Sequence, residues 1–324
     1  MIHSWQELSK QVEAEINAFD FSGNPNELYD PIGYTMTLGG KRIRPTLCLL
    51  AAQLFGGDLK KAMNLALAVE VFHNFTLVHD DIMDEAPIRR GMPAVHAKWN
   101  RDVAILSGDV MFVQAYQLLA KGNPAKLSQM LSVFNQTAIE VCEGQQFDMN
   151  FETRNDVSAE NYIEMIRLKT GVLLACSLQL GAFESGALEK DAQLIYKFGE
   201  KIGIAFQIQD DFLDCYAKQE DFGKRVGGDI ISNKKTFLML TTMETADKNQ
   251  SDRLGQLLST KLPDEEKVSG VLEIYNELNI PEISKTAMQA YFDEAMLALD
   301  QIEAFTELKQ PLVELAEMLM MRKK

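Results

Sequence analysis

The sequence predicts an all-α protein, and two observations carry that prediction. Apolar residues recur with a helical period along nearly the whole chain, and strand-like alternation is rare. Clusters of turn-forming residues stand between the periodic segments. No Pro/Ser-rich linker or change in composition divides the 324 residues. We therefore expect a single domain over residues 1–324, built as one large helical bundle around a central cavity.

The expected helices follow the apolar periodicity and end at turn signals such as Gly and Pro. They span residues 3–19, 44–56, 59–85, 101–120, 125–147, 157–168, 170–184, 188–217, 235–244, 249–260, 264–277, 281–302 and 306–322.

The charge balance argues against nucleic acid as a partner. The chain has 32 Lys and Arg against 47 Asp and Glu, a net charge of −15, and its only basic run is the short stretch Arg322-Lys323-Lys324. A protein that binds a polyanion needs a basic face. A phosphorylated small molecule remains compatible with this composition.

Cysteine usage and the N-terminal sequence predict a cytoplasmic protein. The four cysteines lie in apolar helical sequence without Cys-x-x-Cys spacing, which is typical of buried thiols in a reducing compartment. The N-terminus lacks the pattern of a signal peptide, and no stretch reaches about 18 uninterrupted apolar residues, so we expect no transmembrane segment.

Two copies of Asp-Asp-x-x-Asp are the strongest functional signal. Asp80-Asp81-Ile82-Met83-Asp84 and Asp210-Asp211-Phe212-Leu213-Asp214 each interrupt an apolar, helix-patterned run. On a helix the first and third aspartates lie one turn apart on one face. A single copy on a solvated face would mean little, but charges within apolar runs are costly without partners. Mg²⁺ commonly combines one or two carboxylates with substrate phosphates, so opposed motifs would bind a phosphorylated substrate through metal ions.

Glycine-rich basic loops accompany these motifs. Gly39-Gly40-Lys41-Arg42-Ile43-Arg44-Pro45 precedes a predicted helix, an arrangement that suits a diphosphate. Ile88-Arg89-Arg90-Gly91-Met92-Pro93 follows the first acidic motif. A third loop, from Phe222 to Asp229, follows the second motif and leads to Lys234. Such loops are common surface turns, but two of these three trail acidic motifs.

These motifs resemble those of the trans-isoprenyl diphosphate synthases of the polyprenyl synthetase family. The resemblance runs through nearly the whole chain and implies the isoprenoid synthase fold. The matching pieces, in family order, are Gly39–Pro45, His73, Asp80–Asp84, Arg89-Arg90-Gly91, Ser107-Gly108-Asp109, Gly144–Asp148, Lys169-Thr170-Gly171, Gln207–Asp214, Gly223-Lys224, Gly228-Asp229 and Lys234.

The resemblance implies a prenyltransferase that ionises an allylic diphosphate. Mg²⁺, three ions per active site, would be held by Asp80, Asp84 and Asp210. The residues expected to act on the allylic substrate, in catalysis or in binding, are Asp80, Asp81, Asp84, Arg89, Lys169, Thr170, Gln207, Asp210, Lys224 and Lys234. Cations and metal ions would stabilise the departing diphosphate, and the closed site would protect the carbocation from water.

Isopentenyl diphosphate is the implied second substrate, bound without metal by Lys41, Arg44, His73 and Arg90. A lone histidine among apolar residues is more often a core residue than a ligand. His73, however, lies seven residues before Asp80, within about 20° of the same helix face. His79 and His96 are expected to be structural.

Product length is assigned by the resemblance alone. Phe75 and Thr76, five and four residues before the first acidic motif, resemble the residues that limit synthases to C15 or C20 products. A helical wheel places Phe75 about 140° from Asp80, so geometry alone does not select it. Phe112 and Tyr116 could line the same tail pocket or pack in the core. The family also implies a homodimer.

Several alternatives stay open at this point. The chain could be a longer-chain polyprenyl diphosphate synthase or a noncatalytic subunit of a heteromeric synthase, although such a subunit would be expected to lose an acidic motif. A terpene cyclase would leave Lys41 and Arg44 unexplained. A metal phosphohydrolase would not require two matched acidic motifs with basic loops.

Overall fold

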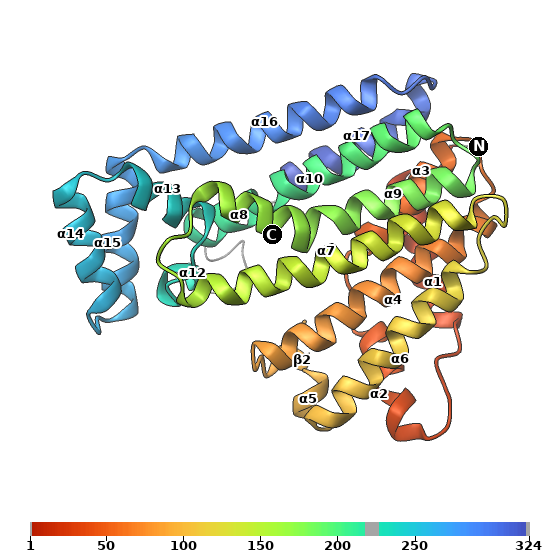
Figure 1. Cartoon of the computed structure of the whole chain (residues 1–324), viewed down its shortest axis with the longest axis horizontal. Helices are drawn as coiled ribbons and strands as arrows, with labels where there is room; N and C mark the ends of the chain where they lie inside the picture. The colour runs from red at the N-terminus through yellow and green to blue at the C-terminus, as the bar shows by residue number, and fades with distance from the viewer. Residues whose placement is uncertain (1, 218–226, 322–324) are drawn as a thin grey trace. The chain divides into compact units, whose positions relative to one another are not determined.

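The computed structural model describes residues 2–217 and 227–321, and the described chain is almost entirely helical (Figure 1). The fold-class prediction is therefore confirmed. The helices of the first half are α1 Trp5–Ala18, α2 Asn26–Thr37, α3 Ile43–Leu54, α4 Leu59–Met83, α5 Val95–Lys98, α6 Arg101–Leu119, α7 Leu127–Thr153 and α8 Ala159–Ile166. The π-helical segment η1 Arg167–Gly171 follows, and then α9 Val172–Glu184, α10 Glu189–Tyr216, α12 Gly228–Ile231, α13 Phe237–Thr245, α14 Lys248–Ser259, α15 Asp264–Glu277, α16 Ile280–Asp300 and α17 Thr306–Met320.

Side-chain caps set several helix starts. Ser4 caps α1 in a capping box with Glu7, and Asp58 accepts a hydrogen bond from the backbone N–H of Lys60 at the start of α4. Asn100 caps α6 in the same way. These contacts satisfy backbone N–H groups that have no partner within the helix.

The predicted helix list omits three of the described helices, ends one helix early and places one break where the helix continues. Helix α2 was not expected, because Pro31 lies inside it and interrupts the helical pattern. The list also lacks the short helices α5 and α12, and α7 continues to Thr153 beyond its predicted end at residue 147. The expected break near residue 169 is instead a π turn, through which the helix runs on from α8 into α9.

The chain forms two compact units, each built from separate segments. The first comprises Met1–Phe134, Cys176–Tyr196 and Ile302–Glu314, and the second comprises Asn135–Ala175, Lys197–Gln301 and Leu315–Lys324. In the first unit α4 packs along α6 and α3 (Figure 1). In the second, α13 packs against α8 and α16. The first acidic motif belongs to the first unit and the second acidic motif to the second.

Strands are confined, in the described chain, to a small hairpin of β1 (Ile88–Arg89) and β2 (Met92–Pro93). Ile88 pairs with Pro93 and Arg89 with Met92 in antiparallel register. The turn residues Arg90 and Gly91 have φ of 53° and 77°, the left-handed pair that a two-residue hairpin turn requires. The second basic loop is thus a two-residue β-hairpin turn.

One helical stretch, Ala159–Glu184, is long and apolar enough to cross a membrane. However, 83% of its most apolar window is buried inside the protein, as expected for a core helix. Tyr162 and Leu180 illustrate this burial, with 1% and 0% of their surfaces exposed.

Candidate active site

The first acidic motif ends helix α4. Asp80 and Asp81 lie in its last turn, and Asp84 is its C-terminal cap, with a backbone N–H that donates to the carbonyl of Asp80 at 2.9 Å. The second motif lies in the last two turns of α10. A helix C-terminus carries partial negative charge, so both positions favour a bound cation.

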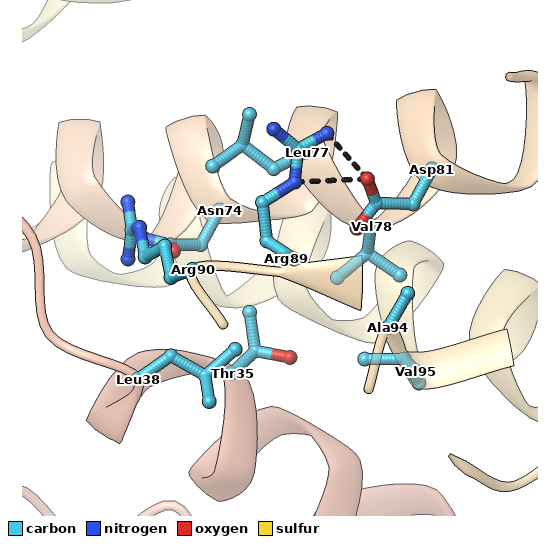
Figure 2. A pocket seen from close by; sticks show the side chains of 10 residues that line it. All are labelled: Thr35, Leu38, Asn74, Leu77, Val78, Asp81, Arg89, Arg90, Ala94 and Val95. Carbon is cyan, nitrogen blue, oxygen red and sulfur yellow. Dashed lines mark hydrogen bonds and ion pairs between the residues drawn. The ribbon is translucent and has the colours of Figure 1, made fainter. Parts of the chain in front are cut away.

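The Asp81 carboxylate forms an ion pair with Arg89. The carboxylate is buried and accepts from the Nε of Arg89 at 2.8 Å and from the Nη2 of the same guanidinium, as Figure 2 shows. Asp80 Oδ2 lies 3.7 Å from that guanidinium. Burial lowers the pKa of Arg89, but Asp81 outweighs it through its hydrogen bond and charge, so the net pKa is raised. Arg89 is therefore a fixed positive charge beside the aspartates.

Asp80 and Asp84 fit a Mg²⁺ site. Asp84 is exposed, and Asp80 keeps 20% of its side chain exposed one turn away. Within residues 2–217 and 227–321, no three His, Cys, Asp or Glu side chains form a ready-made metal site. Two carboxylates on a helix end suit an ion that completes its shell with water and phosphate oxygens.

The first basic loop gathers cations at the N-terminus of α3. Arg44 donates through Nη1 to Nε2 of His73 at 3.2 Å. Arg90, from the hairpin turn, donates to the carbonyl of Gly39 and lies beside Asn74 in a small pocket (Figure 2). The structure thus brings Arg44, His73 and Arg90 together beside the loop that carries Lys41.

His73 is neutral in this setting. Burial holds its pKa well below the usual value, and the charges of Arg44 and Arg90 lower it further. A neutral imidazole accepts the Arg44 hydrogen bond and leaves the guanidinium positively charged. The helical wheel predicts His73 on the Asp80 face of α4, and in the structure its ring contacts Arg44.

In the second unit, Asp211 is the buried member of its motif. It accepts a hydrogen bond from the Tyr162 hydroxyl at 2.7 Å and another from the backbone N–H of Phe237 at 3.4 Å. Burial first, and the charge of Asp229 second, raise the pKa of Asp211 to about 7. Asp214 accepts from the backbone N–H of Asp229 at 3.0 Å, so both carboxylates help to order the polypeptide around Asp210.

The π turn η1 carries Lys169 and Thr170. Lys169 Nζ lies 2.6 Å from Asp148 Oδ2, and the Thr170 hydroxyl donates to Gln207 Oε1 at 3.3 Å. Two glycines allow neighbouring helices to approach this turn. A Cβ at Gly144 would lie 2.4 Å from the backbone nitrogen of Lys169, and one at Gly203 would lie 2.5 Å from the Cα of Gly171.

Lys234 and Lys235 are adjacent but have different environments. Burial lowers the pKa of Lys234, but the charges of Asp229 and Asp211 outweigh it, so the net pKa lies above its usual value. Lys235 donates instead to the carbonyls of Phe151 and Glu152 at 2.6 and 3.1 Å. Lys234 Nζ lies 4.0 Å from Asp229 Oδ1, whereas Lys235 fixes the C-terminal end of α7.

The predicted chain-length residues Phe75 and Thr76 lie on α4 near His79. The Thr76 hydroxyl donates to the carbonyl of His73 at 2.7 Å. Phe75 packs against Phe112 at 5.2 Å between ring centroids and against His79 at 4.8 Å. His79 also contacts the carbonyl of Ile105, as expected of a structural residue. Lys224 lies outside the described residues.

Some residues of these sites were not singled out from the sequence. Tyr162 and Glu70 lie within ordinary helical patterns, which carry no sign of their buried polar partners. Asp148 and Asp229 stand in matched motifs but were given no role. The sequence groups Arg42 with Lys41 and Arg44, but the Arg42 guanidinium is buried and bound to Glu70 and Glu13.

The helical fold, the two acidic motifs and the basic loops beside them are the features expected of a prenyltransferase. The family model for polyprenyl synthetase matches residues 25–276, and the chain belongs to this family. It is an isoprenyl diphosphate synthase of the short-chain group, a class that acts on isoprenoid diphosphates and generally depends on divalent metal ions.

Several known proteins support this assignment. The chain is 37% identical over 316 residues to the geranylgeranyl diphosphate synthase of Methanosarcina mazei, covering 97% of this chain and 95% of that one. It is 35% identical to the enzyme of the same name from Sulfolobus acidocaldarius, covering 99% and 98% of the two chains. A crystal structure of a geranylgeranyl pyrophosphate synthase superposes with a TM-score of 0.93 at 41% identity, covering 100% of both chains.

Proposed function

We propose that this enzyme condenses isopentenyl diphosphate with an allylic diphosphate to form a short trans-prenyl diphosphate of 15 or 20 carbons. The names of its relatives favour the C20 product, geranylgeranyl diphosphate. The observation that carries the proposal is the contrast within the first unit. Carboxylates gather at the C-terminal end of α4, while Arg44, Arg90 and a neutral His73 gather at the N-terminus of α3.

The allylic diphosphate is the substrate of the acidic motifs. Asp80, Asp84 and Asp210 would hold three Mg²⁺ ions, which when bound neutralise charge on the diphosphate as it departs. Arg89, held by Asp81, would add a fixed positive charge. Lys169, Lys224 and Lys234 would also bind the oxygens of the allylic diphosphate. Since ligands come from both motifs, the whole chain would work as one isoprenoid synthase domain.

Thr170 and Gln207 would face the allylic carbocation left when the C–O bond breaks. Their mutual hydrogen bond orients both side chains, and their dipoles would stabilise positive charge without acting as nucleophiles. The double bond of isopentenyl diphosphate then attacks the cation. By family resemblance, the released diphosphate accepts the proton that is lost.

Isopentenyl diphosphate would bind at the N-terminus of α3. Lys41, Arg44 and Arg90 supply positive charge, and the helix N-terminus adds backbone N–H groups and a favourable dipole. A neutral His73 accepts the Arg44 hydrogen bond, and its other ring N–H would donate to a diphosphate oxygen. This site requires no metal ion.

Product analysis by mass spectrometry tests the proposal. Purified protein with isopentenyl diphosphate, Mg²⁺ and a C5, C10 or C15 allylic diphosphate should form C15 or C20 diphosphates, and a chelator should abolish them. Products of C30 or longer would point to a long-chain synthase. A folded protein that forms no product would point to a noncatalytic subunit.

Two substitutions test the assignment of sites. Asp80→Ala should abolish turnover and leave the helical circular dichroism spectrum unchanged. Lys41→Ala should raise the KM for isopentenyl diphosphate about 10- to 100-fold, the equivalent of one charge-assisted hydrogen bond, and should change the allylic KM less. An equal rise in both KM values would contradict the two-site assignment.

The protein is further proposed to be a cytoplasmic homodimer. Helix α6 exposes Ile105, Leu106 and Val113, a run of apolar surface that a second copy could cover. Analytical ultracentrifugation should give twice the mass of 36.4 kDa. Leu106→Lys should shift that mass toward the monomer, and a wild-type monomer at micromolar concentration would refute the dimer.

A further inference from the structure

Arg42, the second of the three cations in the first basic loop, is buried inside the protein. Arg42 has only 3% of its surface exposed. Its Nη1 donates to Glu70 Oε1 at 2.6 Å, its Nε to Glu13 Oε2 at 2.7 Å, and its Nη2 to the carbonyl of Met36 at 2.7 Å. All three nitrogens of the guanidinium are thus engaged by three separate segments.

The acceptor from α4 is itself held firmly. Glu70 is 2% exposed, and its Oε1 also accepts from Nδ2 of Asn74, one helical turn later, at 3.1 Å. Asn74 donates as well to the carbonyl of Glu70 at 2.8 Å. Glu70 is therefore fixed on the helix that carries His73.

Arg42 also determines the local backbone. Its φ of 49° is left-handed, a conformation that a non-glycine residue adopts only at an energetic cost. Its carbonyl accepts from both the backbone N–H and the hydroxyl of Thr46, at 3.1 and 2.7 Å, and so begins α3. The side-chain contacts hold this strained residue in place, and with it the directions of Lys41 and Arg44.

Stability alone gives a weak reason for such a network. Burying charged groups carries a large desolvation cost, and a hydrophobic replacement of similar volume is often equally or more stable. The network does, however, fix the position of the loop relative to α4. It joins the loop to α4 at Glu70, three residues before the His73 ring that Arg44 contacts.

We propose that Arg42, Glu70 and Glu13 are positioning residues for isopentenyl diphosphate. They hold the loop so that Lys41 and Arg44 meet the diphosphate, and they touch neither substrate. This inference rests on the function proposed above. A displacement of a binding group by about 1 Å at such a site is enough to weaken substrate use strongly.

Steady-state kinetics with one substrate saturating and the other varied test this role. Glu70→Gln, which keeps the side-chain shape but removes the charge, should raise the KM for isopentenyl diphosphate about tenfold and leave the allylic KM within about twofold. Glu13→Gln should raise the same KM about threefold, because Glu70 still holds Arg42. Glu13 is 38% exposed in its side chain, so this variant should fold even if Glu70→Gln does not.

The matched control is Glu15→Gln, on the same helix as Glu13 but exposed. It removes the same charge and should change neither KM. A purely structural network would lower the melting temperature while the two KM values stayed unchanged or rose together, and either result would overturn the inference. If Lys41→Ala itself fails to raise the KM for isopentenyl diphosphate selectively, the proposed site is wrong. If Lys41→Ala behaves as expected and Glu13→Gln and Glu70→Gln do not, only the positioning role is wrong.

Discussion

Replacing Gly144 by alanine should reduce catalysis far more than it reduces stability. Gly144 lies on α7, and a Cβ there would lie 2.4 Å from the backbone N of Lys169 and 2.8 Å from its Cα. Ordinary contact begins at 3.4 Å, so α7 and the π turn must separate by about 1 Å. The obstacle is backbone, which cannot rotate away as a side chain could.

The two energetic effects of this substitution partly cancel. Overpacking costs about 1–3 kcal/mol, and alanine in a helix interior gains about 1 kcal/mol over glycine. The net destabilisation is therefore about 0–2 kcal/mol, which a folded protein of this size should survive. A 1 Å displacement of Lys169 and Thr170 should nevertheless lower kcat about 100-fold.

The assay combines kcat with saturating substrates and thermal unfolding of the same preparation. Gly255→Ala is the matched control, since Gly255 lies inside α14 with nothing within 4 Å of its added Cβ. The control should gain up to about 1 kcal/mol of stability and keep full activity. If Gly144→Ala behaves like this control, the close approach of α7 does not position Lys169, and the reasoning is refuted.

Three further predictions concern other residues. Since the pKa of His73 is lowered in the folded state, the unfolded state binds the extra proton below about pH 6.5, and stability should fall as pH falls through that value. Urea unfolding at pH 7.5 and 5.5 measures this change in the free energy of unfolding. The decrease between the two pH values should be smaller in His73→Gln than in the wild type, by up to about 1.4 kcal/mol, and an equal decrease in both proteins would refute the buried neutral histidine. Phe75→Ala should lengthen the product beyond that of the wild type, and an unchanged product spectrum would exclude Phe75 as the residue that limits chain length. Lys235→Met should speed amide hydrogen exchange at the C-terminal end of α7, because two carbonyls lose their donor, and unchanged exchange there would contradict that contact's importance.

Local sequence signals account for most of the fold. The long helices could be predicted because their apolar periods extend over many residues and clusters of turn-forming residues separate them. Helix α2 could not be predicted, because Pro31 indicates a helix end in the sequence whereas tertiary packing of Ile32 and Met36 stabilises the helix in the structure. The π turn escaped because no single-residue pattern distinguishes an extra residue within a helix from a short break.

For the candidate site, residue types could be predicted but pairings could not. The motifs predict that Asp80, Arg89 and Lys169 act together on the allylic diphosphate. Nothing in the sequence shows that Asp81 belongs to Arg89 or that Asp211 is bonded to Tyr162, 49 positions away. Such pairings depend on tertiary packing, which a helical period does not encode.

The π turn at Arg167–Gly171 has a consequence for how this segment tolerates change. A π turn contains one residue more than the α-helical turn it replaces. Deletion of Leu168 would allow a regular helix from α8 to α9, with a more uniform backbone hydrogen-bond pattern. The same deletion would rotate every side chain on one flank by about 100° relative to the other. Lys169 and Thr170 would then lose their register with Asp148 and Gln207. A regular helix over Ala159–Glu184 would therefore lose the contacts of Lys169 with Asp148 and of Thr170 with Gln207, and this chain retains the extra residue.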